Sequence, residues 1–161
     1  MWKILLSSVS LLGVAAVGPA APERKVGRPD GFRSWVHVKS AINDPEHAPF
    51  GRFRGMYHVY ANAKAMEGYR SGHFPDGSII VSAQHDVATA NHHMIATQRR
   101  FVDVMEKDSR SFAATGGWGY EEFATGTDAR LTESNPAASA RCYACHATQA
   151  GHDSVYSRYV D

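Results

Sequence analysis

Two cysteines and one histidine near the end of this 161-residue chain have a spacing that can hold a prosthetic group. They stand in the run Cys142-Tyr143-Ala144-Cys145-His146, which contains the only two cysteines of the sequence. The pattern Cys-x-x-Cys-His is typical of haem c attachment, in which each thiol adds across one haem vinyl group. The adjacent histidine then serves as an axial ligand of the iron. We therefore expect one covalently attached haem c, bound by Cys142, Cys145 and His146.

Three other interpretations of the thiols stay open at this point. A redox-active dithiol does not need the adjacent histidine. A zinc site would recruit His152 as a second histidine, although structural zinc is less expected in an exported protein. A plain disulfide is the simplest alternative outside a reducing cytoplasm. Haem is favoured because covalent attachment of haem c requires two cysteines at this spacing followed directly by a histidine.

The N-terminus has the composition of a secretory signal. Lys3 supplies a positive charge, residues 4–17 form an apolar run, and small residues end at Ala20. The run is too short to span a bilayer comfortably, and no second apolar segment follows it. We expect a signal peptide over 1–20, an extended lead-in over 21–31 and a single haem domain over 32–161. The protein is then periplasmic or otherwise exported.

Charge excludes one class of partner. The formal net charge is +1, and removal of Lys3 with the signal leaves sixteen basic and sixteen acidic residues. A balanced chain has no basic excess with which to neutralise phosphates, so we expect no nucleic-acid partner and no membrane partner after processing.

Periodicity and turn residues predict a chain of mixed secondary structure. Asn62 is a helix-capping residue, and 74–77 (Phe-Pro-Asp-Gly) is a turn sequence. We expect helices over 63–70 and 136–150, the latter carrying the haem residues, with Pro136 in its first turn and Gly151 at its end. The remaining expected elements are a short helix over 32–42, a helix over 98–107, and strands over 53–61, 78–81 and 117–123.

The late position of the haem motif narrows the class of cytochrome. Fifteen residues follow His146, and none of them is methionine. An electron carrier with an early attachment site and a downstream methionine ligand is therefore disfavoured. The strand-like segments argue against a four-helix bundle, the other class with a late site.

Several runs of this sequence resemble the cytochrome P-460 family in the same order, over about residues 32–160. They are 57–62 (Tyr-His-Val-Tyr-Ala-Asn), 72–81 (Gly-His-Phe-Pro-Asp-Gly-Ser-Ile-Ile-Val), 107–110 (Lys-Asp-Ser-Arg), 117–120 (Gly-Trp-Gly-Tyr), the haem motif, and 153–159 (Asp-Ser-Val-Tyr-Ser-Arg-Tyr). The resemblance implies an α+β fold that is mainly an antiparallel β-sheet with flanking helices and haem on a C-terminal helix. It also implies a homodimer and a five-coordinate iron open to small nitrogen-oxide ligands.

The resemblance also points to one departure. Hydroxylamine-oxidising members carry a lysine that cross-links to the haem, and it aligns immediately after Val81. This sequence has Ser82 there, which cannot form that bond. The departure favours the cytochrome c′-beta type, which lacks the cross-link and binds nitric oxide or carbon monoxide in an apolar pocket.

Four residues are candidates for the distal wall of that pocket: Phe53, Tyr57, Phe74 and Ser82. Bulk over the open iron face would exclude water while admitting a diatomic gas. Ordinary core packing is the alternative for each aromatic residue. A histidine closing the sixth position is also open, with His92 and His93 the most conspicuous pair. As adjacent strand residues, they point to opposite faces, so one at most reaches the iron.

The sequence thus predicts an exported mono-haem cytochrome that binds nitric oxide or a similar ligand at a His146-ligated iron. One alternative is a haem enzyme that oxidises hydroxylamine or nitric oxide or acts as a peroxidase. Another is a six-coordinate electron-transfer protein with a redox partner protein.

Overall fold

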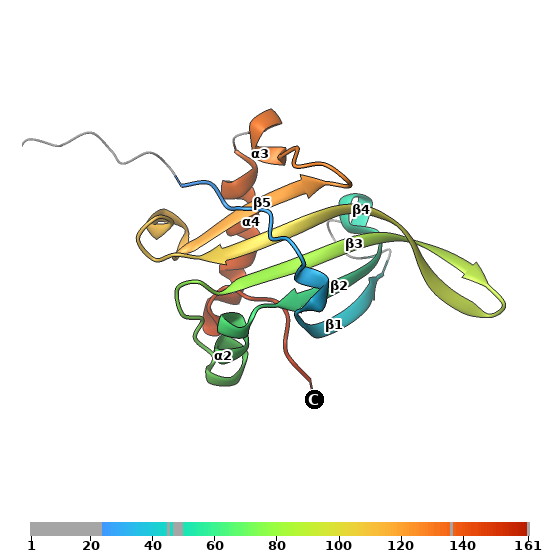
Figure 1. Ribbon diagram of the computed structural model, residues 1–161, viewed down its shortest axis with the longest axis horizontal. Helices are drawn as coiled ribbons and strands as arrows, with labels where there is room; N and C mark the ends of the chain where they lie inside the picture. Colours follow the sequence, from blue (N-terminus) through green and yellow to red (C-terminus); the bar gives the residue numbers. More distant parts are fainter. Residues whose placement is uncertain (1–23, 45, 47–49, 136, 161) are drawn as a thin grey trace, which may run out of the picture.

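A single antiparallel sheet organises the molecule (Figure 1). The computed structural model describes residues 24–44, 46, 50–135 and 137–160, so the expected signal peptide over 1–20 lies outside the described residues. The five strands follow chain order across the sheet: β1 (Val36–Asn43), β2 (Gly55–Ala61), β3 (Ile79–Ala90), β4 (His93–Lys107) and β5 (Trp118–Ala124). Every neighbouring pair is antiparallel, as short local connections allow.

Short helices surround the sheet and confirm the expected α+β class. They are η1 (Phe32–Ser34), α1 (Phe50–Phe53), α2 (Ala63–Ser71), η2 (Ala113–Thr115), α3 (Leu131–Ser134), α4 (Ala138–His146) and η3 (Ala147–His152). The N-terminal segment crosses one face of the sheet, while α4 runs along the other (Figure 1). We call the face toward α4 the near face and the opposite one the far face. No helix within the described ranges is long and apolar enough to cross a membrane.

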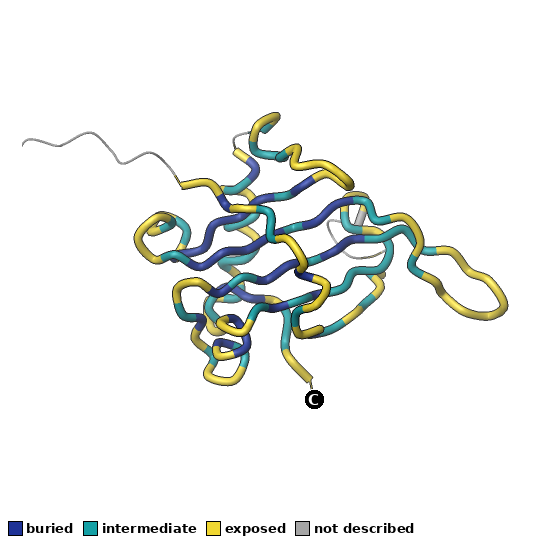
Figure 2. The backbone as a smooth tube through the Cα atoms, in the orientation of Figure 1, coloured by how far each residue is buried: buried dark blue, intermediate teal, exposed yellow. Residues whose placement is uncertain are grey.

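Each face has its own core, because side chains alternate along the strands. The far-face core packs Val26 and Phe32 of the N-terminal segment onto the sheet. The near-face core joins the sheet to α2 and the C-terminal segment through Met66, Phe74 and Val155. Figure 2 shows the buried positions concentrated in the central strands.

The predicted capped helix and turn are confirmed. The Asn62 side chain accepts a hydrogen bond from the Ala65 amide at 2.8 Å, and Gly72 ends α2 in a left-handed conformation with φ 83°. Gly77 leaves the predicted turn with φ 85°. Both glycines stand where a positive φ is required, which a side chain would resist. The predicted strands over 78–81 and 117–123 correspond to the start of β3 and to β5, and the strand over 53–61 corresponds to β2, which begins only at Gly55 because Phe53 ends α1.

Two predicted helices are wrong. Residues 98–107 belong to β4, and 32–42 form η1 followed by β1. β4 lies between two other strands and buries Phe101, Val102, Val104 and Met105 on both faces. A strand buried on both sides reads as an apolar run without alternation, which sequence periodicity alone does not separate from a helix.

The haem-motif helix is shorter than expected. It ends as an α-helix at His146 and continues as the 3-10 turn η3, rather than running over 136–150. Ala137 stands at the N-cap position, and its side chain forms no capping hydrogen bond. The expected first-turn residue Pro136 lies outside the described residues. Gly151 is not the stop. The chain instead reverses at Asp153 and Ser154, which both adopt left-handed backbone angles.

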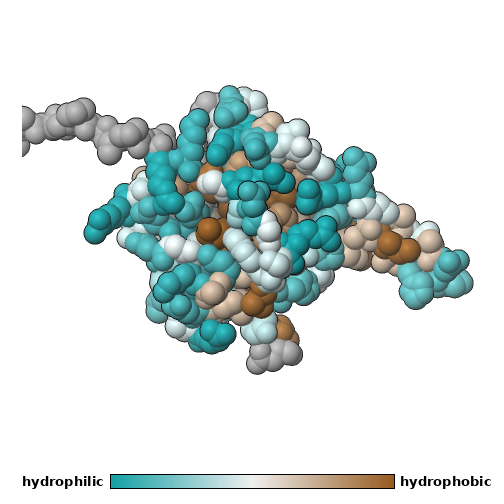
Figure 3. Space-filling view, in the orientation of Figure 1, coloured by the Kyte–Doolittle hydropathy of each residue, from teal (hydrophilic) through white to brown (hydrophobic). Residues whose placement is uncertain are grey.

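Strands β3 and β4 extend beyond the sheet as a hairpin arm (Figure 1). Ala90 pairs with His93, so the turn consists of Asn91 and His92, with φ of 50° and 65°. Two positive φ angles are typical of the tight turn that matches strand twist. Apolar residues are visible on the arm in Figure 3, and Met94 and Ile95 are 54% and 46% exposed.

Candidate functional site

His146 stands at the end of α4 with one ring nitrogen already committed. Its Nδ1 lies 2.9 Å from the Ser154 carbonyl oxygen. A carbonyl oxygen only accepts, so Nδ1 carries the proton and Nε2 keeps a free lone pair. This is the usual arrangement of a metal-ligating histidine, whose second nitrogen is held by a carbonyl or carboxylate. Burial lowers the pKa of His146, which the hydrogen bond to Ser154 partly opposes, and the neutral ligand form is favoured.

Two tyrosines fix the plane of that imidazole. The ring centroids of Tyr120 and Tyr156 each lie 5.1 Å from the ring of His146. Tyr156 is itself anchored, since its hydroxyl donates to the Cys145 carbonyl at 3.0 Å and lies 2.8 Å from Thr148 Oγ1. The side chain of His146 therefore has little rotational freedom.

The Ser154 carbonyl is held in place by a strained strap, which we define as residues 153–158. Asp153 and Ser154 have φ of 51° and 62°, a conformation that side chains other than glycine adopt at a cost. Asp153 is clamped from several directions. Its carboxylate binds Lys107 Nζ at 2.6 Å and the Phe74 amide at 3.0 Å, and its carbonyl accepts from Trp118 Nε1 at 2.8 Å. Such strain persists where surrounding contacts over-determine it.

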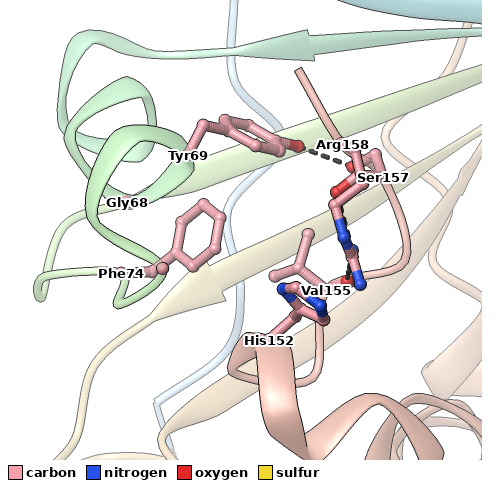
Figure 4. Close-up of a pocket in the computed structure, with 8 residues that line it drawn as sticks. Gly68, Tyr69, Phe74, His152, Val155, Ser157 and Arg158 are labelled. Atoms are coloured by element: carbon pink, nitrogen blue, oxygen red, sulfur yellow. Dashed lines mark hydrogen bonds between the residues drawn. The ribbon is translucent and has the colours of Figure 1, made fainter. Parts of the chain in front are cut away.

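Behind the strap lies a small cavity of about 30 Å³ (Figure 4). Tyr69 of α2 reaches across it, and its hydroxyl lies 2.6 Å from Ser157 Oγ. His152 lines this cavity. No group of three or more histidine, cysteine or acidic side chains in the described part of the chain could hold a metal ion, so nothing supports the zinc alternative.

The two thiols are free, and they differ in environment. Cys145 is exposed, whereas Cys142 is half-buried. Burial, followed by the charges of Asp103 and Glu122, raises the pKa of Cys142 to about 11. A redox-active cysteine needs the opposite, a thiolate at neutral pH. The environment of Cys142 is therefore not that of a reactive thiolate.

Next to these thiols, the near face of the sheet is only partly covered by protein. Ser82, Asp103 and Glu122 are register partners across β3 to β5, and Tyr57 of β2 lies on the same face, two residues before the partner of Ser82; all four are half-buried. Their far-face neighbours Val81, Ala83, Val102, Val104 and Phe123 are buried. The hydroxyl of Tyr120 is also buried without a hydrogen-bond partner, which is unusual in a complete structure. The residues present thus fit a large group bound between α4 and this face.

A carboxylate pair occupies the middle of that half-covered row. Asp103 and Glu122 are direct partners in the β4–β5 register, and Arg52 forms an ion pair with Glu122. Desolvation and then the charge of Glu122 raise the pKa of Asp103 well above its ordinary value, against the effect of Arg52. Asp103 is therefore able to hold a proton at a pH where a free carboxyl is ionised.

The four predicted distal residues separate into two groups. Tyr57 and Ser82 lie on the half-covered near face, and Phe53 ends α1 with its ring 5.9 Å from Phe101 of β4. Phe74 instead lies in the near-face core, 5.0 Å from the ring of Tyr69 and 5.5 Å from that of Trp118. For Phe74, core packing describes the position well.

Sequence reasoning missed several residues here. Asp103 was not identified as a site residue because 98–107 was predicted to be a helix. Glu122 and Tyr120 of β5 were not identified either, because they join this site only through the pairing of β5 with β4. Lys39 was not considered either. Its Nζ lies 5.7 Å from the centre of the Tyr57 ring, on the same face as Ser82. The residues around the site that were not predicted as site residues are, from the sheet, α1 and the strap, Lys39, Arg52, Asp103, Lys107, Tyr120, Glu122, Asp153 and Tyr156.

The other described histidines lie away from this row. His37, His58 and His85 group on the far face, where the His37 and His58 rings are 6.3 Å apart and those of His58 and His85 are 5.1 Å apart. His92 and His93 are exposed at the tip of the hairpin arm. His73 and His152 are exposed beside α2 and in η3, and His47 lies outside the described residues.

Comparison with known proteins agrees with this geometry. A family model described as Cytochrome P460 matches residues 29–157, which include the sheet, α4 and nearly all of the strap. No curated protein matches the chain.

Proposed function

Because the chain belongs to the cytochrome P460 family, we propose that it is an exported mono-haem c-type cytochrome that binds nitric oxide or a similar small ligand. Cys142 and Cys145 form the two thioether bonds, and His146 Nε2 is the single protein ligand of the iron. When bound, the haem supplies an iron site that can take a diatomic ligand opposite the histidine. We propose that the mature protein is periplasmic and forms a homodimer.

The observation that carries this proposal is Ser82. It lies on the half-covered near face, between Val59 of β2 and Asp103 of β4. A lysine at this position would point toward the haem, as the cross-linking lysine of hydroxylamine-oxidising members would. A serine hydroxyl cannot form that cross-link. Two lysines share this face: Lys39 lies against Tyr57, and Lys107 is held by Asp153.

The placement of the histidines supports an open iron face. The described imidazoles other than His146 belong to the far face, the hairpin arm, η3 and the turn after α2. The near-face row instead presents Tyr57, Ser82 and Asp103. Steric access and polarity on that side determine whether a diatomic ligand is bound or activated.

The test is the absorption spectrum and peptide mass of the purified holoprotein. We expect two thioether bonds as the only covalent links to haem, a ferrous spectrum of five-coordinate haem, and a saturable spectral change with nitric oxide. Lys39→Met should leave the spectrum unchanged. A band displaced far to the red, lost in Lys39→Met, would instead identify Lys39 as a cross-linking residue. A low-spin six-coordinate ferrous spectrum would favour electron transfer.

His146→Ala tests the axial ligand. The thioether bonds do not involve His146, so the variant should retain covalently bound haem and lose the spectral signature of histidine ligation. Survival of that signature in His146→Ala would show that another residue is the axial ligand.

A second function, oxidation of hydroxylamine or nitric oxide, is favoured by one observation. Asp103 is a carboxyl with a raised pKa on the same row as Ser82, and it is placed to accept or donate a proton. Turnover of hydroxylamine with an artificial electron acceptor would support this function if Asp103→Asn lowered it at least tenfold, since a positioned acid or base contributes about 100-fold or more. Asp128→Asn, at an exposed carboxylate paired with Arg28, is the matched control.

A further inference from the structure

The far face of the sheet contains a cavity of about 360 Å³ that has no part in the site described above. It lies between η1 and the base of the hairpin arm. His58 and Tyr60 of β2 and Ala83 and His85 of β3 alternate with the near-face residues, so the sheet separates this cavity from α4. Its lining residues are Arg33, His58, Tyr60, Ala83, His85, Ala96, Thr97 and Arg99.

Two guanidinium groups in this lining have no carboxylate counterpart. Within the described ranges, neither Arg33 nor Arg99 forms an ion pair, and the lining contains no acidic residue. The nearby Asp86 is directed toward Arg100 and Arg54, at 3.6 and 3.9 Å. Arg99 is half-buried, and its guanidinium group has no carboxylate partner among the described residues. A partly buried positive charge without a counter-charge is costly, so a negative group in this cavity would be stabilising.

The remaining polar groups of the cavity are suited to the same ligand. His85 Nδ1 lies 3.1 Å from the Ala83 carbonyl and therefore carries a proton, so Nε2 becomes a second donor once the ring is protonated. His58 Nδ1 lies 2.6 Å from Ser40 Oγ, which in turn lies 2.8 Å from His37 Nε2. Tyr60 and Thr97, which carry hydroxyl groups, also line the cavity.

The electrostatics favour an anion over a metal cation. Burial lowers the pKa of His58 and of His85, and the charges that act on them are other histidines and Arg33 and Arg99. A cation would add to that repulsion. An anion would relieve it and would favour protonation of both imidazoles. Among the described residues no set of three ligands suits a metal ion.

We infer that this far-face cavity binds a small oxyanion, held by Arg33 and Arg99 with His58, His85, Tyr60 and Thr97 as further donors. The occupant carries oxygen acceptors and negative charge, as phosphate, sulfate and nitrite do. Guanidinium forks suit such planar or tetrahedral oxyanions better than they suit chloride. Binding takes up protons at the two imidazoles and is therefore tighter at pH 6 than at pH 8.

The experiment is a titration of the haem-loaded protein with sodium phosphate, sodium sulfate and sodium nitrite, followed by calorimetry and thermal unfolding. Sodium chloride at equal ionic strength is the reference. We expect saturable binding of at least one oxyanion, and a Soret band that phosphate and sulfate leave unchanged. A Soret shift with nitrite that persists in the variants below would report binding at the iron, a separate event.

The variants Arg99→Gln and Arg33→Gln should each weaken that binding by about tenfold or more, as expected for the loss of one charge-assisted hydrogen bond. Arg33 is exposed, so its variant is available even if Arg99→Gln fails to fold. Arg110→Gln, at an exposed arginine outside the cavity, is the matched control. The inference is overturned if no oxyanion binds above the chloride reference, or if Arg33→Gln binds as tightly as Arg110→Gln.

Discussion

His146 is aligned less by its own helix than by groups that hold the carbonyl of Ser154. Asp153 links this carbonyl to the sheet through Lys107, to the turn after α2 through the Phe74 amide, and to β5 through Trp118. Lys107 and Asp153 are therefore positioning residues. In the proposed haem site they would act on His146 through the backbone of the strap, without contact with the iron.

Asp153→Asn should lower the free energy of unfolding by about 2–3 kcal/mol, because it leaves the largely buried Lys107 ammonium without its counter-charge. The variant should also shift the haem reduction potential, since the hydrogen bond to His146 Nδ1 is loosened. Lys107→Met should shift it in the same direction. Lys64→Met, which breaks an exposed pair with Glu67, should cost at most about 0.5 kcal/mol and leave the potential unchanged. An unchanged potential in Asp153→Asn would contradict the positioning role.

We expect Asp108 to make the stability of the loop after β4 sensitive to acid. Its carboxylate accepts from the Ser111 amide and hydroxyl at 3.0 and 2.9 Å and pairs with Arg24, and these contacts lower the pKa of Asp108 to about 2. A lowered acid pKa stabilises the fold above the unfolded value near 3.8, and that stability is lost as pH falls through about 2. The difference in melting temperature between wild type and Asp108→Asn should therefore be positive at pH 5 and shrink toward pH 2.

Ser111→Ala provides the companion measurement for Asp108. It removes one of the hydrogen-bond donors to Asp108. The melting-temperature difference between wild type and Ser111→Ala should therefore change with pH in the same sense as for Asp108→Asn, but by a smaller amount. If the melting-temperature difference of Asp108→Asn stays constant between pH 5 and pH 2, Asp108 is not the source of the acid sensitivity.

At the scale of elements, the turn after α2 contacts the strap, because the Phe74 amide donates a hydrogen bond to the Asp153 carboxylate. Phe74 packs its ring against Tyr69 and Trp118 and approaches Gly68 so closely that α2 has no space for a side chain there. Phe74 therefore connects the packing of α2 to Asp153 through this hydrogen bond. Packing of α2 is thus connected, through Asp153 and Ser154, to the position of His146.

Gly68→Ala tests the close packing of Phe74 against α2. A Cβ at Gly68 would lie 2.3 Å from Phe74 Cδ1 and 2.8 Å from Phe74 Cα, so backbone as well as side chain must move. The gain in helix propensity, about 1 kcal/mol, is smaller than an overpacking cost of up to about 3 kcal/mol. We expect a net loss of about 1–2 kcal/mol in denaturant unfolding. Gly27→Ala, where no atom lies within 4 Å, should be neutral. Equal stability of the two variants would contradict the close packing.

At the scale of the whole molecule, the hairpin arm is the feature that a single copy leaves unsupported. It projects from the sheet (Figure 1), and its residues Met94 and Ile95 are 54% and 46% exposed. Apolar side chains on a protruding arm suit an interface with a second copy, in which each arm packs on its partner. This surface is our candidate for the proposed homodimer.

The combined variant Met94→Ser and Ile95→Thr should weaken self-association at least tenfold, as measured by analytical ultracentrifugation of the holoprotein. The reason is the loss of two buried apolar side chains, each contributing about 1.5 kcal/mol or more. Val160→Ser, at the exposed C-terminal end, is the control. A wild-type protein that sediments as a monomer would refute the dimer, and an unaffected dimer in the variant would refute the role of the arm.

Local sequence was sufficient for features whose physical cause is local. Cys142, Cys145 and His146 are adjacent in the chain, Asn62 caps the helix that directly follows it, and Gly77 serves its own turn. These predictions need no knowledge of distant residues, because the groups involved are separated by a few bonds. The family resemblance likewise came from short runs in a conserved order along this chain.

The rest depended on contacts between residues far apart in the sequence. β4 is a strand because β3 and β5 supply its hydrogen bonds, although its apolar spacing also suits a helix. Asp103 meets Glu122, and Lys107 meets Asp153, only once the sheet and the strap have formed. The motif near the C-terminus was thus sufficient to predict haem. The row of side chains on the near face, and the strap that holds the Ser154 carbonyl against His146, were decided by the tertiary structure, because local periodicity does not say which distant residues will pair or pack together.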